Sequence, residues 1–163
     1  MLTEIEAKEI SSELNRYEQK SASCIEALRV VQRHRGWVSD EAIVDIAEYL
    51  EMTPADVDGV ATFYNLIFRR PVGTHVLFVC DSVSCWIMGC DKIKNHLTTR
   101  LGVNLGKTSK DGSFTILPIA CLGTCESSPV LMIDGKTVSN VNTNILDEIL
   151  TGLQREDTQG KTA

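Results

Sequence analysis

The chain has 163 residues, of which 43% are hydrophobic and 23% are charged, and it carries a formal net charge of -6. This composition supports one domain or two small ones, and it excludes collagen-like and intrinsically disordered chains. No apolar run approaches the roughly 18 residues of a membrane-spanning helix. The acidic start, MLTEIEAKEI, is unlike a signal or transit peptide, so we expect the chain to stay where it is made, without membrane insertion. The scattered basic residues favour a protein or small-molecule partner over nucleic acid.

Consecutive helices are predicted over the first seventy residues. Their starts are marked by Thr3, Ser23, Ser39 and Thr53, whose side chains can accept hydrogen bonds from free N–H groups. Thr3 and Ser23 are each followed three residues later by Glu, which completes a capping box. The apolar positions of the fourth helix continue to Phe68. This stretch is therefore predicted to be helical throughout.

A change of pattern at residues 69–73, RRPVG, predicts the boundary between two domains, because Pro and Gly end the helix there. The next segment, HVLFVC at residues 75–80, is apolar on both faces, which is typical of a strand covered from both sides. We therefore expect a helical domain over residues 1–72, an α/β domain over residues 73–154 and a frayed polar tail over residues 155–163.

The second domain is predicted to be a small mixed sheet flanked by helices. Its expected elements are a strand at 75–80, a helix at 85–101, strands at 114–117, 129–133 and 136–139, and a final helix capped by Asn142. The turn Asp134-Gly135 predicts a hairpin between the last two strands. The fold class is therefore α/β (α+β), thioredoxin-like in outline, preceded by a helical segment.

Four of the six cysteines form two close pairs. Cys80 and Cys85 lie in CDSVSC, and Cys121 and Cys125 lie in CLGTC. With no export signal, these are expected to be reduced thiols. Because each pair follows a predicted strand, the two pairs can converge at one edge of the sheet as a four-thiolate metal site. The alternative is four small buried hydrophobic residues, which the close spacing in loops disfavours.

Zinc and an iron–sulfur cluster are the two candidates for such a site. Structural zinc prefers tight Cys knuckles, and the CLGTC spacing would be tolerable for it. Two wider loops suit a [2Fe–2S] cluster better, since each pair can hold one iron. Gly123 allows a backbone N–H group to approach a sulfur, and Cys85 lies at a predicted helix start. We therefore favour the iron–sulfur cluster.

The remaining cysteines and the histidines are not predicted to bind metal. Cys90 falls on the apolar stripe of its helix with Trp86 and Ile93, and Cys24 has no thiol near it in sequence. The histidines at positions 34, 75 and 96 have no metal-ligand spacing. The chain has no Cys-x2-Cys motif for dithiol catalysis. It also lacks a glycine-rich fingerprint or phosphate-cradling loop, so we expect it to bind neither NADH nor flavin by itself.

Three strings of sequence resemble a known family. They are GVATFYNLIFRRPVG at residues 59–73, CDSVSC at residues 80–85 and DGSFTILPIACLGTCESSP at residues 111–129. They resemble the thioredoxin-like [2Fe–2S] subunits of bacterial NADH-quinone oxidoreductase (respiratory complex I), known as its E subunits, and the resemblance covers nearly the whole chain. Ser128 departs from the family pattern, which usually has Gly or Ala before the proline. This difference concerns the local hydrogen bonding at the cluster rather than its ligation.

The resemblance implies a ligand set and a set of partners. Cys80, Cys85, Cys121 and Cys125 align with the family's four ligands to one [2Fe–2S] cluster. The chain would be an electron-transfer subunit of an NADH-oxidising, proton-translocating enzyme, with no catalytic residue of its own. Its direct partner would be the flavin-bearing subunit, which holds the FMN and NADH. With the other subunits of the peripheral arm, it would lie on the cytoplasmic side of the inner membrane.

Several alternatives stay open from the sequence. The same module occurs in NAD-linked formate dehydrogenases and NAD(P)-linked hydrogenases. A structural zinc adaptor or, more distantly, a thiol–disulfide oxidoreductase would use the same cysteines. Trp86 and Val130 either keep water from the cluster or pack in the core. Phe63, Tyr64 and Phe68 form either a docking surface or a core stripe between helix and sheet.

Overall fold

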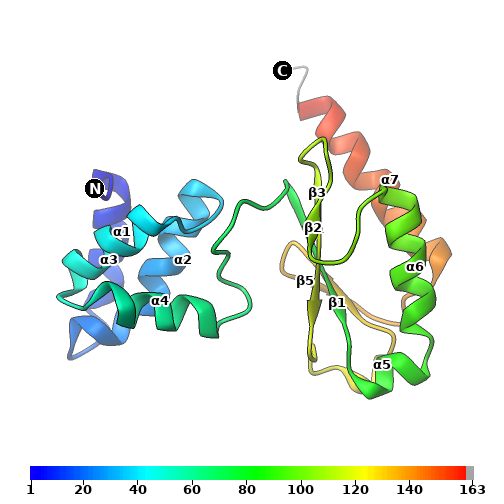
Figure 1. Cartoon of the computed structure of the whole chain (residues 1–163), viewed down its shortest axis with the longest axis horizontal. Helices are drawn as coiled ribbons and strands as arrows, with labels where there is room; N and C mark the ends of the chain where they lie inside the picture. Colours follow the sequence, from blue (N-terminus) through cyan, green and yellow to red (C-terminus); the bar gives the residue numbers. More distant parts are fainter. Residues whose placement is uncertain (161–163) are drawn as a thin grey trace. The chain divides into compact units, whose positions relative to one another are not determined.

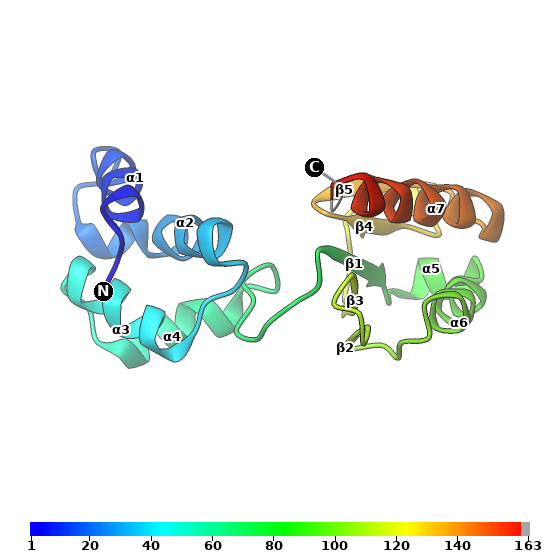
Figure 2. The ribbon, with the colours of Figure 1, turned by 90° about the horizontal axis from the view of Figure 1, so that it is seen from above.

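The computed structural model describes residues 1–160, with side chains described through residue 155. The chain divides into two compact units, Met1–Val72 and a second unit that begins at Gly73 (Figure 1, Figure 2). The first unit is helical and the second is a mixed sheet with helices, so the fold class is the predicted α/β class with a helical segment before it. None of the helices in residues 1–160 combines the length and the apolar character needed to cross a membrane.

Four α-helices build the first unit. They are α1 (Glu4–Leu14), α2 (Cys24–Arg35), α3 (Asp40–Leu50) and α4 (Pro54–Phe63), with the 3-10 helix η1 (Lys20–Ser23) before α2. Their apolar faces meet in one core, which includes the fully buried Ile10, Leu28, Ile46 and Leu50. Burying a side chain of this size stabilises the fold by about 1.5–3 kcal/mol. Helical spacing of apolar residues is thus what holds this unit together.

The residues observed at the helix starts can be compared with the predicted N-terminal caps. Thr3 forms a full capping box, and Ser39 and Thr53 each accept a hydrogen bond from the backbone N–H three residues on. The predicted capping box at Ser23 is wrong, although α2 does begin at the next residue. The Ser23 hydroxyl instead donates to the carbonyl oxygen of Lys20, 2.7 Å away, because the 3-10 turn in front of α2 brings that acceptor within reach.

The fourth helix is shorter than predicted. It ends at Phe63, and Tyr64 has an extended backbone with φ -92° and ψ 113°. The chain then turns beside Gln32, whose side chain donates to the carbonyl oxygen of Leu66 at 2.8 Å and accepts from the N–H of Phe68 at 2.6 Å. This side chain satisfies backbone groups that a longer helix would otherwise pair, and so stabilises the turn.

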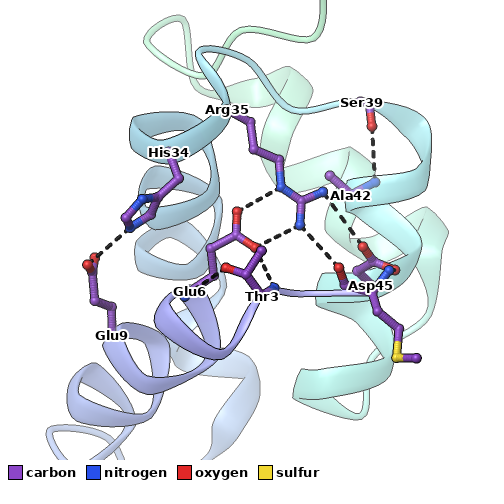
Figure 3. Close-up of polar contacts among 9 residues, drawn as sticks. Thr3, Glu6, Glu9, His34, Arg35, Ser39, Ala42 and Asp45 are labelled. Atoms are coloured by element: carbon purple, nitrogen blue, oxygen red, sulfur yellow. Dashed lines mark hydrogen bonds and ion pairs between the residues drawn. The ribbon is translucent and has the colours of Figure 1, made fainter.

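A buried ion pair joins α1 to α2. The Arg35 side chain donates to both carboxylate oxygens of Glu6, at 2.7 and 2.8 Å (Figure 3). Glu6 is 1% exposed, and its Oε2 also accepts the backbone N–H of Thr3 at 2.8 Å. Asp45 on α3 lies 3.7 Å from Arg35, so one guanidinium group connects three helices. The hydrogen bonds from Arg35 lower the pKa of Glu6 from 4.5 to about 2.

A five-stranded mixed sheet forms the centre of the second unit. Its strands are β1 (His75–Cys80), β2 (Lys107–Thr108), β3 (Phe114–Ile119), β4 (Leu131–Ile133) and β5 (Lys136–Val138), in the spatial order β2-β3-β1-β4-β5. Strands β1 and β3 are parallel, and the other pairs are antiparallel. The sequence predicts β1 at its observed bounds, but it does not predict β2, whose two exposed polar residues carry no apolar alternation. Asp134 and Gly135 have positive φ and form the predicted hairpin turn.

Three helices lie on one side of this sheet: α5 (Val83–Ile87), α6 (Cys90–Leu101) and α7 (Thr143–Gly160) (Figure 1, Figure 2). Side chains from β1, α6 and α7, among them Leu77, Leu97 and Leu146, share a single core. The predicted continuous helix over residues 85–101 is wrong. Gly89 adopts φ +92° and separates α5 from α6, so the two helices follow different directions.

The last helix is longer than the sequence suggests. Asn142 caps α7 as predicted, with its side-chain oxygen accepting the N–H groups of Asn144 and Ile145 at 3.0 Å. The helix continues through Gly160, past residue 154, after which the sequence predicts a frayed tail. Residues 161–163 lie outside the described part of the chain.

Candidate metal centre

The four paired cysteines are positioned by the ends of two neighbouring strands. Cys80 is the last residue of β1 and pairs in register with Ile119, the last residue of β3. Because β1 and β3 are parallel, the segments that follow them leave the same edge of the sheet. Cys85 follows on α5. Cys121 comes two residues after β3, and Cys125 begins the 3-10 helix η2 (Cys125–Ser127).

All four cysteines line one small cavity; the empty space of about 130 Å³ at this place includes open solvent. Its other lining residues are Leu122, Gly123, Thr124 and Val130. The two pairs differ in exposure, since Cys80 and Cys85 are buried whereas Cys121 and Cys125 are exposed. The cavity therefore has one thiol pair facing the core and one pair facing solvent.

Contacts between sulfurs join the thiols as two pairs. The Sγ atoms of Cys121 and Cys125 are 3.7 Å apart, and the Cys85 thiol acts on Cys80 by lowering its pKa. The backbone N–H of Gly123 donates to the sulfur of Cys121 at 3.3 Å, which is the close approach predicted for this glycine, here at φ +81°. Among the side chains that the structure describes, through residue 155, no three of His, Cys, Asp or Glu are placed to hold a single metal ion.

The pKa values of the thiols follow from these contacts. Burial acts to raise the pKa of Cys80, but hydrogen bonds from the Ser82 backbone, the Cys85 thiol and the Leu122 backbone outweigh burial and lower it. The pKa of Cys125 is raised, first by its hydrogen bond with Cys121 and then by repulsion between the two sulfurs. Removing the proton from both thiols of such a pair is therefore unfavourable unless a cation lies beside them. Cysteines that bind a metal are deprotonated when the metal is bound.

Chemical fit to an iron–sulfur group rests on the donor set and on one hydroxyl. The cavity lining contains four thiols and no carboxylate or imidazole. Thiolates are the ligands that hold [2Fe–2S] clusters, in two pairs. The Oγ1 atom of Thr124 is buried, and it has no hydrogen-bond partner among the described residues, whose side chains run through residue 155. A group that accepts hydrogen bonds, as sulfur does, would satisfy this hydroxyl, so the residues present fit the cluster.

Ser128 links the two thiol pairs. The Cys85 thiol donates to the Ser128 hydroxyl oxygen over 3.4 Å, and that hydroxyl donates to the carbonyl oxygen of Cys125 at 2.8 Å. Ser128 is 7% exposed, so both contacts are sheltered from water. The sequence singled out this position, and the structure identifies its two partners.

The other two cysteines are packed away from solvent, as the sequence predicts for Cys90 from its place on an apolar stripe. Cys90 is 1% exposed in the core of the second unit, and its thiol donates to the carbonyl oxygen of Cys80 at 3.1 Å. Cys24 lies in the core of the helical unit. Burial raises the pKa of both thiols to about 11. Each histidine contacts a carboxylate, and none lines the cavity; the pairs are His34 with Glu9, His75 with Asp134 and His96 with Asp147.

Two apolar surfaces stand out in the described residues. The sequence predicts Trp86 on the buried stripe of its helix, but it is 60% exposed, because the break at Gly89 turns α5 away from that stripe. With Val83, Ile87 and Met88 it forms an exposed apolar patch, here called the α5 surface. Val130, in contrast, is buried against the cavity.

The second apolar surface lies in the helical unit. Phe63 is 77% exposed and Tyr64 is 44% exposed, with their rings edge to face at 5.2 Å. A core stripe is therefore wrong for Phe63 and Tyr64. Phe68 is half-buried.

Comparison with known proteins identifies relatives over most of the chain. The family model of thioredoxin-like [2Fe–2S] ferredoxins matches residues 10–154. The E subunit of NADH-quinone oxidoreductase from Pseudomonas aeruginosa is 46% identical over 150 residues, which cover 92% of this chain and 90% of that protein. The E subunit from Escherichia coli K12 is also 46% identical, over 149 residues that cover 91% of this chain and 90% of that protein.

Solved structures share the fold at lower identity. The crystal structure of an NAD+-reducing [NiFe]-hydrogenase in the air-oxidized state matches with a TM-score of 0.69 and 19% identity. The match covers 79% of this chain and 23% of the hydrogenase chain, so the present fold corresponds to less than a quarter of that longer chain.

Proposed function

The chain belongs to the family of thioredoxin-like [2Fe–2S] ferredoxins, and from this we propose that it is the electron-transfer subunit of an NADH-quinone oxidoreductase. We propose further that Cys80, Cys85, Cys121 and Cys125 hold one [2Fe–2S] cluster. The observation that carries the proposal is the convergence of these four thiols, from two strand ends, on one cavity. The curated relatives, which are E subunits of this enzyme, support it over a hydrogenase, with which the chain shares only the fold.

When bound, the cluster supplies a centre that gains and loses single electrons. The chain's own residues would prepare its two sides differently. Cys80 and Cys85 are enclosed by the core, where burial excludes water and lowers the local dielectric constant. Cys121 and Cys125 are exposed, so this pair offers the side from which a partner's redox group can approach. The N–H of Gly123 stabilises negative charge on the Cys121 sulfur.

The α5 surface is the partner contact in this proposal. This helix carries Cys85, and its residue Ser84 is near enough to the exposed Cys125 to act on the pKa of that thiol, so α5 borders the open side of the site. Four large apolar side chains are exposed there, and aromatic residues such as Trp86 are enriched at the centres of protein interfaces. The occupant that this position favours is the flavin-bearing, NADH-oxidising subunit, since its FMN must come close to the cluster. Through that subunit the chain would join the peripheral arm at the membrane surface.

Substitution of single cysteines tests the ligand set. Cys121→Ala is expected to abolish the visible charge-transfer absorption of the anaerobically purified chain, because the cluster loses a ligand. Cys24→Ala is the matched control, since it removes a buried thiol from the other unit. Cys90→Ala is also expected to keep the spectrum, at a modest cost in packing. An unchanged spectrum in Cys121→Ala would refute the ligand assignment.

A further inference from the structure

Thr124 has a buried hydroxyl group that nothing in the fold explains. It lies in the segment between Cys121 and Cys125 and lines the candidate centre. Its Oγ1 atom is shielded from solvent, yet it has no hydrogen-bond partner among the described residues. Leaving a buried hydroxyl unsatisfied is costly, and such a group in a native structure calls for an explanation, such as a redox role or a bound water or ion.

Sulfur is the acceptor that the cavity offers to this hydroxyl. Apart from Thr124 itself, the lining side chains are the four thiols, Leu122 and Val130, with Gly123 adding only backbone. The neighbouring Ser128 differs from Thr124, because its hydroxyl already donates a hydrogen bond to the carbonyl oxygen of Cys125 at 2.8 Å. In the part of the chain that the structure describes, Thr124 is therefore a donor without an acceptor, beside a site that binding would fill with sulfur.

We propose that the Thr124 hydroxyl donates a hydrogen bond to a sulfur of the bound cluster and thereby raises its reduction potential. This inference rests on the proposed function, since it requires the cluster to be present. A hydrogen bond to a thiolate or sulfide stabilises negative charge, and the reduced cluster carries one more negative charge than the oxidised one. The bond is therefore stronger in the reduced state, which makes reduction easier.

The test compares Thr124→Val with the wild-type full chain, both purified anaerobically. Valine has nearly the same shape as threonine but has no hydroxyl. We expect the variant to keep its iron, its sulfide and its visible spectrum, and to show a lower midpoint potential in a redox titration followed by electron paramagnetic resonance. Thr124→Ser keeps a hydroxyl and is expected to restore the potential most of the way to the wild-type value.

A second measurement separates this role from a structural one. Because the Thr124 hydroxyl bonds to no described residue, the cluster-free Thr124→Val chain is expected to melt at the same temperature as the wild type or higher. Thr98→Val is the matched control: its hydroxyl is bonded to the Lys94 carbonyl oxygen at 2.9 Å, away from the cavity. That control is expected to leave the potential unchanged.

Several results would overturn the inference. An unchanged potential in a fully loaded Thr124→Val chain would show that the hydroxyl does not bond the cluster. Loss of the cluster from this variant alone, or a lower melting temperature without the cluster, would show that the hydroxyl has a structural role instead. A wild-type chain that binds no iron and sulfide at all would refute the proposed function itself, which is a separate and recognisable outcome.

Discussion

Replacing Glu6 by glutamine measures how much one buried ion pair stabilises the helical unit. Glu6 is 1% exposed, and both of its carboxylate oxygens accept hydrogen bonds from Arg35 (Figure 3). Its pKa is lowered from 4.5 to about 2, chiefly by those bonds. Each tenfold change in proton affinity is worth about 1.4 kcal/mol, so the lowered pKa corresponds to about 3 kcal/mol of stability. We expect Glu6→Gln to lower the free energy of unfolding at pH 7 by about 2–3 kcal/mol.

The stability difference between the wild type and Glu6→Gln is expected to depend on pH in a defined direction. A carboxylate whose pKa is lowered by folding stabilises the folded state fully above pH 4.5, and that contribution is lost as the pH falls through about 2. The difference between wild type and Glu6→Gln is therefore expected to be constant from pH 7 to about 5 and to shrink below that. Glu4→Gln, an exposed change in the same helical turn, is the control and is expected to have little effect.

Urea unfolding followed by tryptophan fluorescence is a suitable assay. The chain has two tryptophans, and in a Trp86→Phe background the remaining Trp37 lies in the helical unit. Two results would refute the view that this ion pair stabilises the unit. In the first, the free energies of unfolding of the wild type and Glu6→Gln would be equal at pH 7. In the second, their difference would stay constant down to pH 2.

Three further predictions concern the thiols and the surfaces. Burial raises the pKa of Cys90 to about 11, whereas Cys121 is exposed. Iodoacetamide at pH 8 should therefore modify Cys121 but not Cys90 in the folded cluster-free chain, as measured by peptide mass spectrometry. Equal labelling of the two cysteines would contradict this prediction. Gly123→Ala should destabilise the cluster loop by about 1 kcal/mol and speed cluster loss on anaerobic dialysis; an unchanged loss rate would argue against backbone strain at φ +81°. Trp86→Asp should weaken binding of the flavin-bearing subunit at least about tenfold in a titration, and equal weakening by Phe63→Asp would contradict a contact centred on α5.

The sequence identified the parts of the site that depend on strand ends. HVLFVC predicts β1 at its observed bounds, and two cysteine pairs that follow strands are expected to meet at one edge of the sheet, where the structure places them. This worked because a run of apolar residues between turn signals sets both the strand and its end.

Other features depended on backbone details that spacing does not reveal. The apolar stripe predicts Trp86 in the core, but the left-handed conformation of Gly89 ends α5 and leaves Trp86 exposed. Ser23 matches a capping box, yet the 3-10 turn supplies the carbonyl of Lys20 as a competing acceptor. The buried and unbonded state of the Thr124 hydroxyl could not be predicted either, because it depends on every neighbour in the folded cavity.

The most direct test of the proposed [2Fe–2S] cluster is to quantify iron and acid-labile sulfide in the anaerobically purified chain. The same sample, reduced with dithionite, is then measured by electron paramagnetic resonance. If the four thiols hold a [2Fe–2S] cluster, the chain will contain about two irons and two sulfides and will show the signal of one unpaired electron when reduced. A colourless chain with one bound zinc and no such signal would contradict the electron-transfer function and support a structural zinc site.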